Sequence, residues 1–339
     1  MKHIDIVAPC YNEEGCVPLF YQEVSRVLVS LEGYSWSVIF VDDGSTDGTL
    51  AEIKKLAAVH GSDLVKFISF TRNFGKEPAI YAGLKSACGG LVVLMDCDLQ
   101  DPPALIPVMM EAIGEGYESC AVYRVNRTGE TRIRSLFASL FYSIYNSLSA
   151  IKIQPASSDY RLMTRRMVNA VLSIDEVERF SRGLFQWTGF ETKWIGSDYA
   201  RRAAGKSKFS FISLYKYAIN GIAAFSTAPL RLASILGIFI ILTALAYMGL
   251  VFARAPSYEL ASALTAPGYR AIVALILFIG GVVVTLLGII GEYIARIYLE
   301  VKRRPLYIAK ETNINSAKPG MPGIAEAIAE EEAESGEWK

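Results

Sequence analysis

The stretch LVVLMDCDLQDPP at residues 91–103 joins a short apolar run to a cluster of carboxylates. Residues 91–95 have the length and composition of a buried strand, and Asp96 and Asp98 follow directly. Two carboxylates at positions i and i+2 beyond a strand can converge on one hard divalent cation and leave its other positions open to phosphate oxygens. We therefore predict a metal site at Asp96 and Asp98. Asp-X-Asp alone is also common in solvated turns, so its place after a strand supports the prediction.

Three further apolar runs precede this stretch, at residues 4–8, 38–41 and 65–70, and the segments 16–31 and 49–59 between them repeat at helical spacing. Strands that alternate with helices predict an α/β fold, a mostly parallel sheet flanked by helices. Ligands bind such sheets beyond the carboxyl ends of the strands. Three of the four runs end in acidic residues, and an acidic rim repels a nucleotide diphosphate unless a divalent metal stands between them.

Composition restricts the chemistry. Lys+Arg and Asp+Glu are both 34, so the overall charge gives no reason to expect nucleic acid as a partner. The five cysteines are scattered without a Cys-X-X-Cys pair, which indicates a reduced, cytosolic environment. His3 and His60 are the only two histidines, so a histidine-based zinc site or a Ser-His relay is disfavoured. Carboxylates and cations must carry the chemistry.

Other nucleotide motifs are missing or incomplete. No Gly-X-Gly-X-X-Gly follows a predicted strand, which argues against a dinucleotide-binding site. Residues 200–207 end in Gly205-Lys206-Ser207 like a phosphate-binding loop, but Ala200 occupies the first glycine position of that motif. ATP hydrolysis is therefore not expected.

Two long apolar runs, residues 232–253 and 271–291, contain no charged residue. Each is long enough to cross a bilayer as a helix, and we predict transmembrane helices at about 230–253 and 270–293; buried core helices are the alternative. Basic residues gather before the first run and after the second, so the positive-inside rule places both flanks in the cytoplasm. The expected organisation is a cytoplasmic domain at 1–228, two spans within 229–294, and a cytoplasmic tail at 295–339 whose acidic end is disordered. The protein is expected in the inner, cytoplasmic membrane.

Six motifs recur in order along the first 230 residues: VAPCYNEE (7–14), VDDGSTD (41–47), RNFGK (72–76), DCDLQDPP (96–103), SDYRL (158–162) and RAAGKSK (202–208). Together they resemble family 2 glycosyltransferases of the GT-A fold, especially the polyisoprenyl-phosphate branch with dolichol-phosphate mannose synthase and bactoprenol glucosyltransferase. The spans closing on GEYIAR (291–296) look most like the bactoprenol glucosyltransferase subgroup.

The resemblance assigns roles to individual positions. Asp96 and Asp98 would hold Mg²⁺ or Mn²⁺ against the diphosphate of a nucleotide-sugar, and Asp159 falls where bacterial members place a candidate catalytic carboxylate. The other donor-binding residues that it implies are Pro9, Tyr11, Glu13, Val41 and Asp43 at the base and ribose, Cys97 between the metal ligands, and Arg124, Arg202 and Lys208 at the phosphates.

Structural roles compete with several of these assignments. Pro9 and Tyr11 are also suited to turning the chain, and Asp42 to capping the following turn. Arg124 is also compatible with a surface strand, and Asp159 with an ion pair to Arg161 or Arg165.

An amphipathic helix is predicted at about 130–148, where Arg132 and Arg134 precede an apolar stripe. Such a helix can lie in the membrane interface, and its two arginines are expected to bind the acceptor phosphate. Packing on the sheet or on another subunit is the alternative.

The expected reaction is an inverting, metal-dependent transfer of a hexose from a nucleotide-sugar to a polyisoprenyl phosphate such as undecaprenyl phosphate, for cell-envelope glycosylation. UDP-glucose is the favoured donor, with GDP-mannose or a modified aminosugar donor as alternatives. A processive polysaccharide synthase is disfavoured because no Gln-X-X-Arg-Trp motif occurs at Gln186. The rival outside enzymes is an inactive membrane scaffold. The subgroup resemblance also implies a homo-oligomer, plausibly a tetramer.

Overall fold

The computed structural model describes residues 2–125, 156–197 and 268–314, together with position 154 and isolated positions between 235 and 246. The first part alternates strands and helices: β1 (Lys2–Cys10), α1 (Val17–Val29), β2 (Tyr34–Asp42), α2 (Thr49–His60), β3 (Val65–Phe70), α3 (Lys76–Ser86), β4 (Leu91–Leu94), η1 (Pro103–Leu105), α4 (Ile106–Gly114) and β5 (Ser119–Arg124). The described elements that follow are β6 (Ser157–Thr164), α6 (Arg165–Leu172), α7 (Ser181–Trp187), β7 (Thr192–Ser197), α11 (Gly268–Lys302) and β8 (Ala309–Thr312). The four predicted strands are present.

The strands form one eight-stranded sheet in the order β7-β5-β6-β4-β1-β2-β3-β8. Strands β4, β1, β2 and β3 run parallel to one another, and β7 runs parallel to β5. β6 lies antiparallel between β4 and β5, and β8 pairs antiparallel with β3. The expected α/β fold with a mostly parallel sheet is therefore confirmed.

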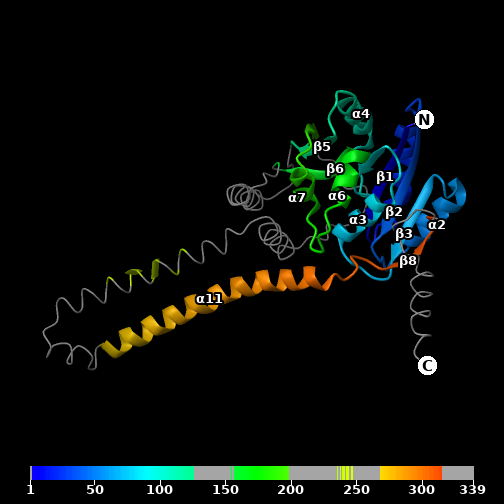
Figure 1. Cartoon of the computed structure of the whole chain (residues 1–339). Coiled ribbons are helices and arrows are strands. Elements are labelled where there is room, and N and C mark those ends of the chain that lie inside the picture. Colours follow the sequence, from blue (N-terminus) through cyan, green and yellow to red (C-terminus); the bar gives the residue numbers. More distant parts are fainter. Residues whose placement is uncertain are drawn as a thin grey trace, which may run out of the picture.

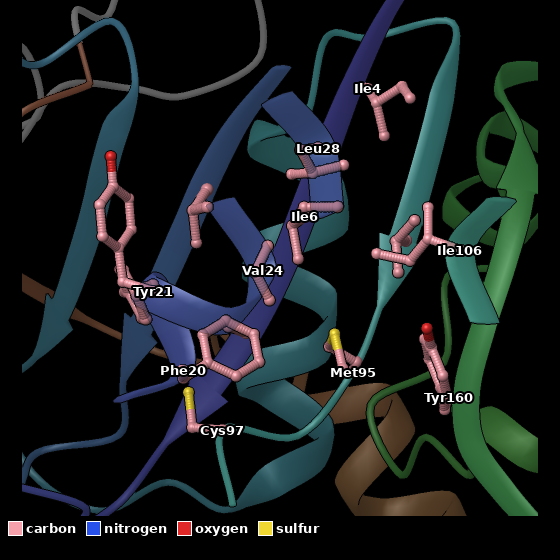
Figure 2. Packing of buried hydrophobic residues seen from close by; sticks show 14 of the residues in the cluster. Ile4, Ile6, Phe20, Tyr21, Val24, Leu28, Met95, Cys97, Ile106 and Tyr160 are labelled. Atoms are coloured by element: carbon pink, nitrogen blue, oxygen red, sulfur yellow. The ribbon is translucent and has the colours of Figure 1, made fainter. Parts of the chain in front are cut away.

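Helices cover both faces of the sheet because successive strand residues point to opposite sides. Ile4 and Ile6 face the helices α1, α2 and α4, whereas Val7 faces α3, α6 and α7. Figure 2 shows the first of these cores, where Phe20 and Val24 of α1 lie beside β1. The buried residues of α1 recur at helical spacing, so one face of that helix packs on the sheet.

Helix α11 is the one helix within the described part of the chain that is long and apolar enough to cross a membrane; its stretch Phe278–Lys302 contains an 18-residue window with a mean hydropathy of 2.0. Figure 1 shows it leaving the sheet domain as one long element. The second predicted span was placed at about 270–293, but the helix continues to Lys302. It continues because Arg296 and Glu300, which follow the apolar run, contact the sheet domain. The first predicted span falls mostly outside the described residues, although the isolated positions between 235 and 246 are helical.

The edge strand β8 comes from a segment that the sequence analysis placed in the tail. Tyr307 stacks on Phe70 with ring centroids 4.7 Å apart, and the Thr71 N–H donates to the carbonyl of Ile308 at 3.0 Å. These contacts bring Ala309–Thr312 beside β3 (Figure 1). The sequence AKET has no apolar run or β-branched cluster, so its pairing depends on the contacts just before it. The polar tail beyond Ile308 was predicted to be disordered, which β8 corrects for Ala309–Thr312; its acidic end lies outside the described residues.

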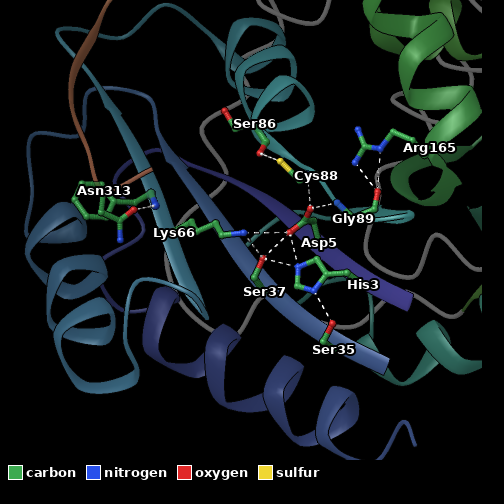
Figure 3. Close-up of polar contacts among 11 residues, drawn as sticks. His3, Asp5, Ser35, Ser37, Lys66, Ser86, Cys88, Gly89, Arg165 and Asn313 are labelled. Carbon is green, nitrogen blue, oxygen red and sulfur yellow. Dashed lines mark hydrogen bonds and ion pairs between the residues drawn. The ribbon is translucent and has the colours of Figure 1, made fainter. Parts of the chain in front are cut away.

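A buried carboxylate near the start of β1 ties together the end of the sheet opposite the rim (Figure 3). Asp5 is fully buried and accepts hydrogen bonds from the Cys88 and Gly89 N–H groups, each at 2.6 Å. The Ser37 hydroxyl also donates to it, and the Lys66 ammonium lies 3.7 Å away. Burial raises the pKa of Asp5, but Ser37, the two N–H groups and Lys66 outweigh it and hold the pKa below its usual value.

We expect Asp5→Ala to lower the free energy of unfolding by about 3 kcal/mol, because it leaves buried donors and Lys66 without their carboxylate. A depressed carboxylate pKa stabilises the fold above the unfolded value near 4 and loses that effect as pH falls through the folded value. The difference between variant and wild type should therefore shrink below about pH 4. Thermal unfolding in detergent, followed by circular dichroism at pH 7 and at about pH 3, measures both effects.

The control for this change is Ser35→Ala, which removes only the 2.8 Å contact between Ser35 and His3 at the edge of the same network. Its expected cost is about 1 kcal/mol or less. Equal melting temperatures for Asp5→Ala and Ser35→Ala would contradict a central role for Asp5.

Candidate functional site

The carboxyl ends of β1 and β4 lie side by side where the strand order β3-β2-β1-β4 reverses direction along the chain. This is the topological switch point at which ligands bind in open α/β sheets. The loop after β1 is fixed to the loop after β2: the Asn12 N–H donates to Ser45 at 2.9 Å, and the Asn12 side chain accepts from the Thr46 N–H at 2.8 Å. The Glu13 N–H donates to the Thr49 hydroxyl at 2.7 Å. Tyr11 and Glu13 therefore lie in a loop at the edge of the sheet whose position is fixed by hydrogen bonds.

Asp42 and Val41, at the end of β2, have structural roles. Asp42 accepts from the Ser45 N–H at 3.0 Å and from the Ser69 hydroxyl at 2.7 Å, so it caps the turn as the competing interpretation expected. The Val41 side chain is fully buried in the core on the α3 side, and the residue pairs in register with Pro9. A nucleotide contact from position 41 must therefore come from the main chain, because its side chain faces away from solvent.

Asp43 fixes the loop that precedes α3. Its carboxylate accepts from the N–H groups of Phe74 at 2.7 Å and Gly75 at 2.9 Å. Burial raises the pKa of Asp43, and those N–H groups partly offset the rise. Gly44 has φ +65°, and a Cβ there would lie 2.3 Å from the carbonyl carbon of Arg72, so only glycine allows the two loops to approach this closely.

The Asp-Cys-Asp turn follows β4 in a strained conformation. Leu99 has φ 55°, which is uncommon for a residue with a side chain, and the Gln100 N–H donates to the Asp98 carboxylate at 3.2 Å. Asp98 is buried, whereas the Asp96 side chain is 34% exposed. Cys97 points into the core, where its sulfur lies 2.7 Å from that of Cys10. Position 97 can therefore contact a donor only through its main chain.

The two carboxylates fit a divalent metal that is shared with a ligand. Hard oxygen donors suit Mg²⁺ and Mn²⁺. Within residues 2–125, 156–197 and 268–314, no group of three or more histidine, cysteine, aspartate or glutamate side chains gathers as a complete metal cage. Asp96 and Asp98 would hold such an ion only together with other oxygen atoms, and phosphate oxygens are suited to supply them.

A lysine joins this turn to Asp159. The Lys76 ammonium, in the first turn of α3, lies 2.8 Å from the Asp96 carboxylate and 2.6 Å from the Asp159 carboxylate. Arg182, in the first turn of α7, donates from Nε to the other oxygen of Asp159 at 2.6 Å. Burial raises the pKa of Asp159, but Arg182 and Lys76 outweigh it and hold the pKa well below its usual range. Asp159 is therefore ionised and engaged by two cations.

The ion-pair partners suggested from sequence for Asp159 were wrong. Arg165 donates to the carbonyl of Gly89 at 2.9 and 2.6 Å. Arg161 lies fully buried with its guanidinium 3.9 Å from the ring centroid of Phe185, and burial lowers its pKa to about 9. Alternation along β6 puts Arg161 on the same face as Asp159, but α7 lies over that face and Phe185 takes the guanidinium.

Glu77 holds α7 against α3. Its carboxylate accepts from the Ser181 N–H at 2.9 Å and from the Ser181 hydroxyl, so it caps the first turn of α7. Burial raises the pKa of Glu77, and the Ser181 hydroxyl lowers it. Lys76 and Glu77 of α3 thus both lie at the start of α7. Glu77 contacts Ser181, and Lys76 shares the partner Asp159 with Arg182.

Neither Lys76 nor Arg182 was predicted to be a site residue. Lys76 ends the RNFGK motif after β3, and that position on the rim was an available signal. Arg182 lies 23 positions beyond Asp159 in the chain, without a pattern that links the two. Arg124 ends β5 and interacts electrostatically with Asp101, whose carboxylate accepts from Ser158. The remaining predicted residues, Arg132, Arg134, Arg202 and Lys208, lie outside the described residues.

Comparison with known proteins adds two family models and several full-length relatives. The model of glycosyl transferase family 2 matches residues 5–172, and the model of the GtrB C-terminal hairpin matches residues 228–297. The chain is 42% identical to the putative glycosyltransferase CsbB of Bacillus subtilis, over 92% of each chain. It is 38% identical to the bactoprenol glucosyl transferase of Shigella phage SfII, over 91% of this chain and 98% of that protein. Glucosyl-3-phosphoglycerate synthase from Mycobacterium tuberculosis aligns with 66% of this chain and 78% of its own, at 21% identity and a TM-score of 0.45.

Proposed function

Because the chain belongs to glycosyl transferase family 2 and is a glycosyltransferase, we propose that it transfers glucose from UDP-glucose to a polyisoprenyl phosphate such as undecaprenyl phosphate. The observation that carries this proposal is the similarity to bactoprenol glucosyl transferases along nearly the whole of both chains. The match to the GtrB C-terminal hairpin at 228–297 supports it, because that range includes both apolar runs.

The proposed setting is the cytoplasmic face of a membrane that both apolar runs cross. Large apolar side chains of α11, such as Leu275, Phe278 and Val284, are more than half exposed, as expected for a helix that faces lipid. The positive residues after the second run favour a cytoplasmic site, close to a lipid phosphate at the interface. Arg132 and Arg134 remain the proposed contacts to that phosphate.

In the proposed reaction a phosphate oxygen of the lipid attacks the anomeric carbon of the sugar. The new C–O bond forms as the bond from that carbon to the diphosphate breaks, with inversion, giving a lipid-phosphate-sugar and a nucleoside diphosphate. The attacking oxygen is already anionic near neutral pH, so the reaction needs little general-base assistance. Stabilisation of the leaving diphosphate is the larger requirement.

The chain's own residues divide this work. Asp96 and Asp98 would hold Mg²⁺ or Mn²⁺, which when bound offsets the charge of the diphosphate. The rim loops fixed by Asn12 and Asp43 would orient the base and ribose. Arg182 and Lys76 hold the pKa of Asp159 well below its usual range, which disfavours a role as general base, and its proposed role is to hold Lys76 beside Asp96 and the reacting phosphates.

The test is transfer of radiolabelled sugar from UDP-glucose, and in parallel from GDP-mannose, to undecaprenyl phosphate in detergent. Assays run with Mg²⁺, with Mn²⁺ and with chelator. We expect label in the lipid fraction from UDP-glucose, lost with chelator. Label from GDP-mannose alone would show that the donor is GDP-mannose and not UDP-glucose. Folded protein that binds nucleotide but labels no lipid would favour the inactive membrane scaffold.

A further inference from the structure

The cytoplasmic end of α11 forms hydrogen bonds with the loop between α6 and α7. The Glu300 carboxylate accepts from the Val177 N–H at 2.9 Å and from the Glu178 N–H at 3.2 Å. Arg296, four residues earlier on the same side of the helix, donates to the Glu178 side chain. The two contacts are reciprocal, because a carboxylate of the helix holds the loop backbone while a carboxylate of the loop holds an arginine of the helix.

The same loop is fixed on its other side to the sheet domain. Arg179 is nearly buried and donates to the carbonyls of Ile174 at 2.6 Å and Val171 at 3.0 Å, at the end of α6. Its guanidinium also lies 4.8 Å from the ring centroid of Tyr81 in α3. The loop is therefore held between the membrane helix and the helices that cover the site.

Three residues separate Glu178 from Arg182, which holds Asp159 at 2.6 Å. Asp159 in turn holds Lys76, and Lys76 contacts Asp96. The first turn of α7 thus begins close to the contact with α11, and its Arg182 is linked through Asp159 and Lys76 to Asp96, one of the predicted metal ligands. A displacement of the loop at Glu178 would therefore displace Arg182 and, through Asp159, Lys76.

We infer that Glu300 is a positioning residue, through which the membrane helix fixes Arg182 and, with it, Asp159 and Lys76. The inference rests on the proposed transfer for its kinetic part only. The end of α11 would then have a second role besides anchoring the enzyme in the membrane. It would also hold Arg182 and Lys76 in position at the reacting phosphates.

Hydrogen exchange of the full-length protein in detergent tests the structural part without any assay of transfer. Glu300→Ala should speed exchange at Val177 and Glu178 and also through Ser181–Trp187, the first turn of α7 most. Glu292→Gln is the matched control, because Glu292 pairs with Arg296 at 3.1 Å but does not touch the loop. Faster exchange confined to Val177 and Glu178 would reduce Glu300 to a local tether and overturn the inference.

Kinetics test the positioning role in the same preparations. We expect Glu300→Ala to lower kcat for transfer about tenfold, the scale of a lost charge-assisted hydrogen bond, with KM for the nucleotide-sugar within about twofold. Glu300→Gln, which keeps an acceptor oxygen, should recover part of the loss, and it also serves if the alanine variant does not fold. In an Arg182→Lys background, Glu300→Ala should cost less than about twofold, because the two residues act through one contact.

A tenfold loss in both backgrounds, or wild-type kcat in Glu300→Ala, would overturn the inference. If wild-type protein itself transfers no sugar to lipid, the proposed function fails instead, and the exchange measurement still decides whether Glu300 holds α7.

Discussion

Asp98→Ala is expected to lower turnover by about 10²–10³, even with saturating nucleotide-sugar and saturating Mn²⁺. Asp98 lies buried in a turn whose backbone is strained at Leu99, so the turn restricts the position of its carboxylate. Loss of one of the two proposed metal ligands would remove charge stabilisation from the leaving diphosphate, which the proposed reaction needs most. Initial rates of lipid labelling, measured across a Mn²⁺ titration, give the effect on turnover.

The matched control is Asp63→Ala, which removes a carboxylate from an exposed loop before β3 and should keep wild-type turnover. Binding of Mn²⁺ to the protein in the presence of UDP, whose phosphates supply the remaining oxygen ligands, supplies a second readout by electron paramagnetic resonance and should weaken only in Asp98→Ala. Unchanged turnover of Asp98→Ala at saturating metal would remove Asp98 from the metal site.

The sequence predicted the parts of the fold that depend on local pattern. Residues 38–41 lie in β2 as predicted, because a parallel strand buried on both faces needs only a continuous apolar run. Ala309–Thr312 carries no such pattern, and its place in the sheet depends on Tyr307 meeting Phe70, more than 200 residues away in the chain. Such a contact is a property of the folded chain, so the domain boundary drawn after residue 228 misses one strand.

The candidate site also contains residues that local pattern predicts and residues that only contacts in the folded chain bring together. Asp96 and Asp98 could be placed from sequence because both carboxylates follow a buried strand, and the structure has them just after β4; their metal role stays a prediction. Cys97 lies in the predicted turn, but its side chain faces Cys10 in the core, a direction that the residue pattern does not predict. The partners of Asp159 were missed because α7 brings Arg182 to β6 only after both helix and sheet have formed. Charge alone favoured Arg161 and Arg165, which are nearer in sequence.

Asp159 gives the prediction that most directly separates an anchor from a base. Asp159→Asn should lower turnover about 10²-fold, because Lys76 and Arg182 lose the carboxylate that aligns them. Lys76→Gln should cost about as much, and the double variant should be little worse than either single one, since the residues act as one unit. Lys193→Gln, which breaks a lysine–carboxylate pair with Glu115 on the surface, is the matched control and should be neutral.

The pH dependence decides between the two roles. The two cations hold the pKa of Asp159 well below its usual range against the effect of burial, so the carboxylate keeps its charge above the ordinary value near 4 and loses it only at lower pH. The wild-type rate should therefore show no acid limb from Asp159 between about pH 5 and 8, and Asp159→Asn should lower the plateau without moving either limb. An anchor affects the rate equally across that range, because its protonation does not change there. A limb in the wild-type profile that disappears in Asp159→Asn would instead identify Asp159 as the base, and Lys76 would then serve only to tune it.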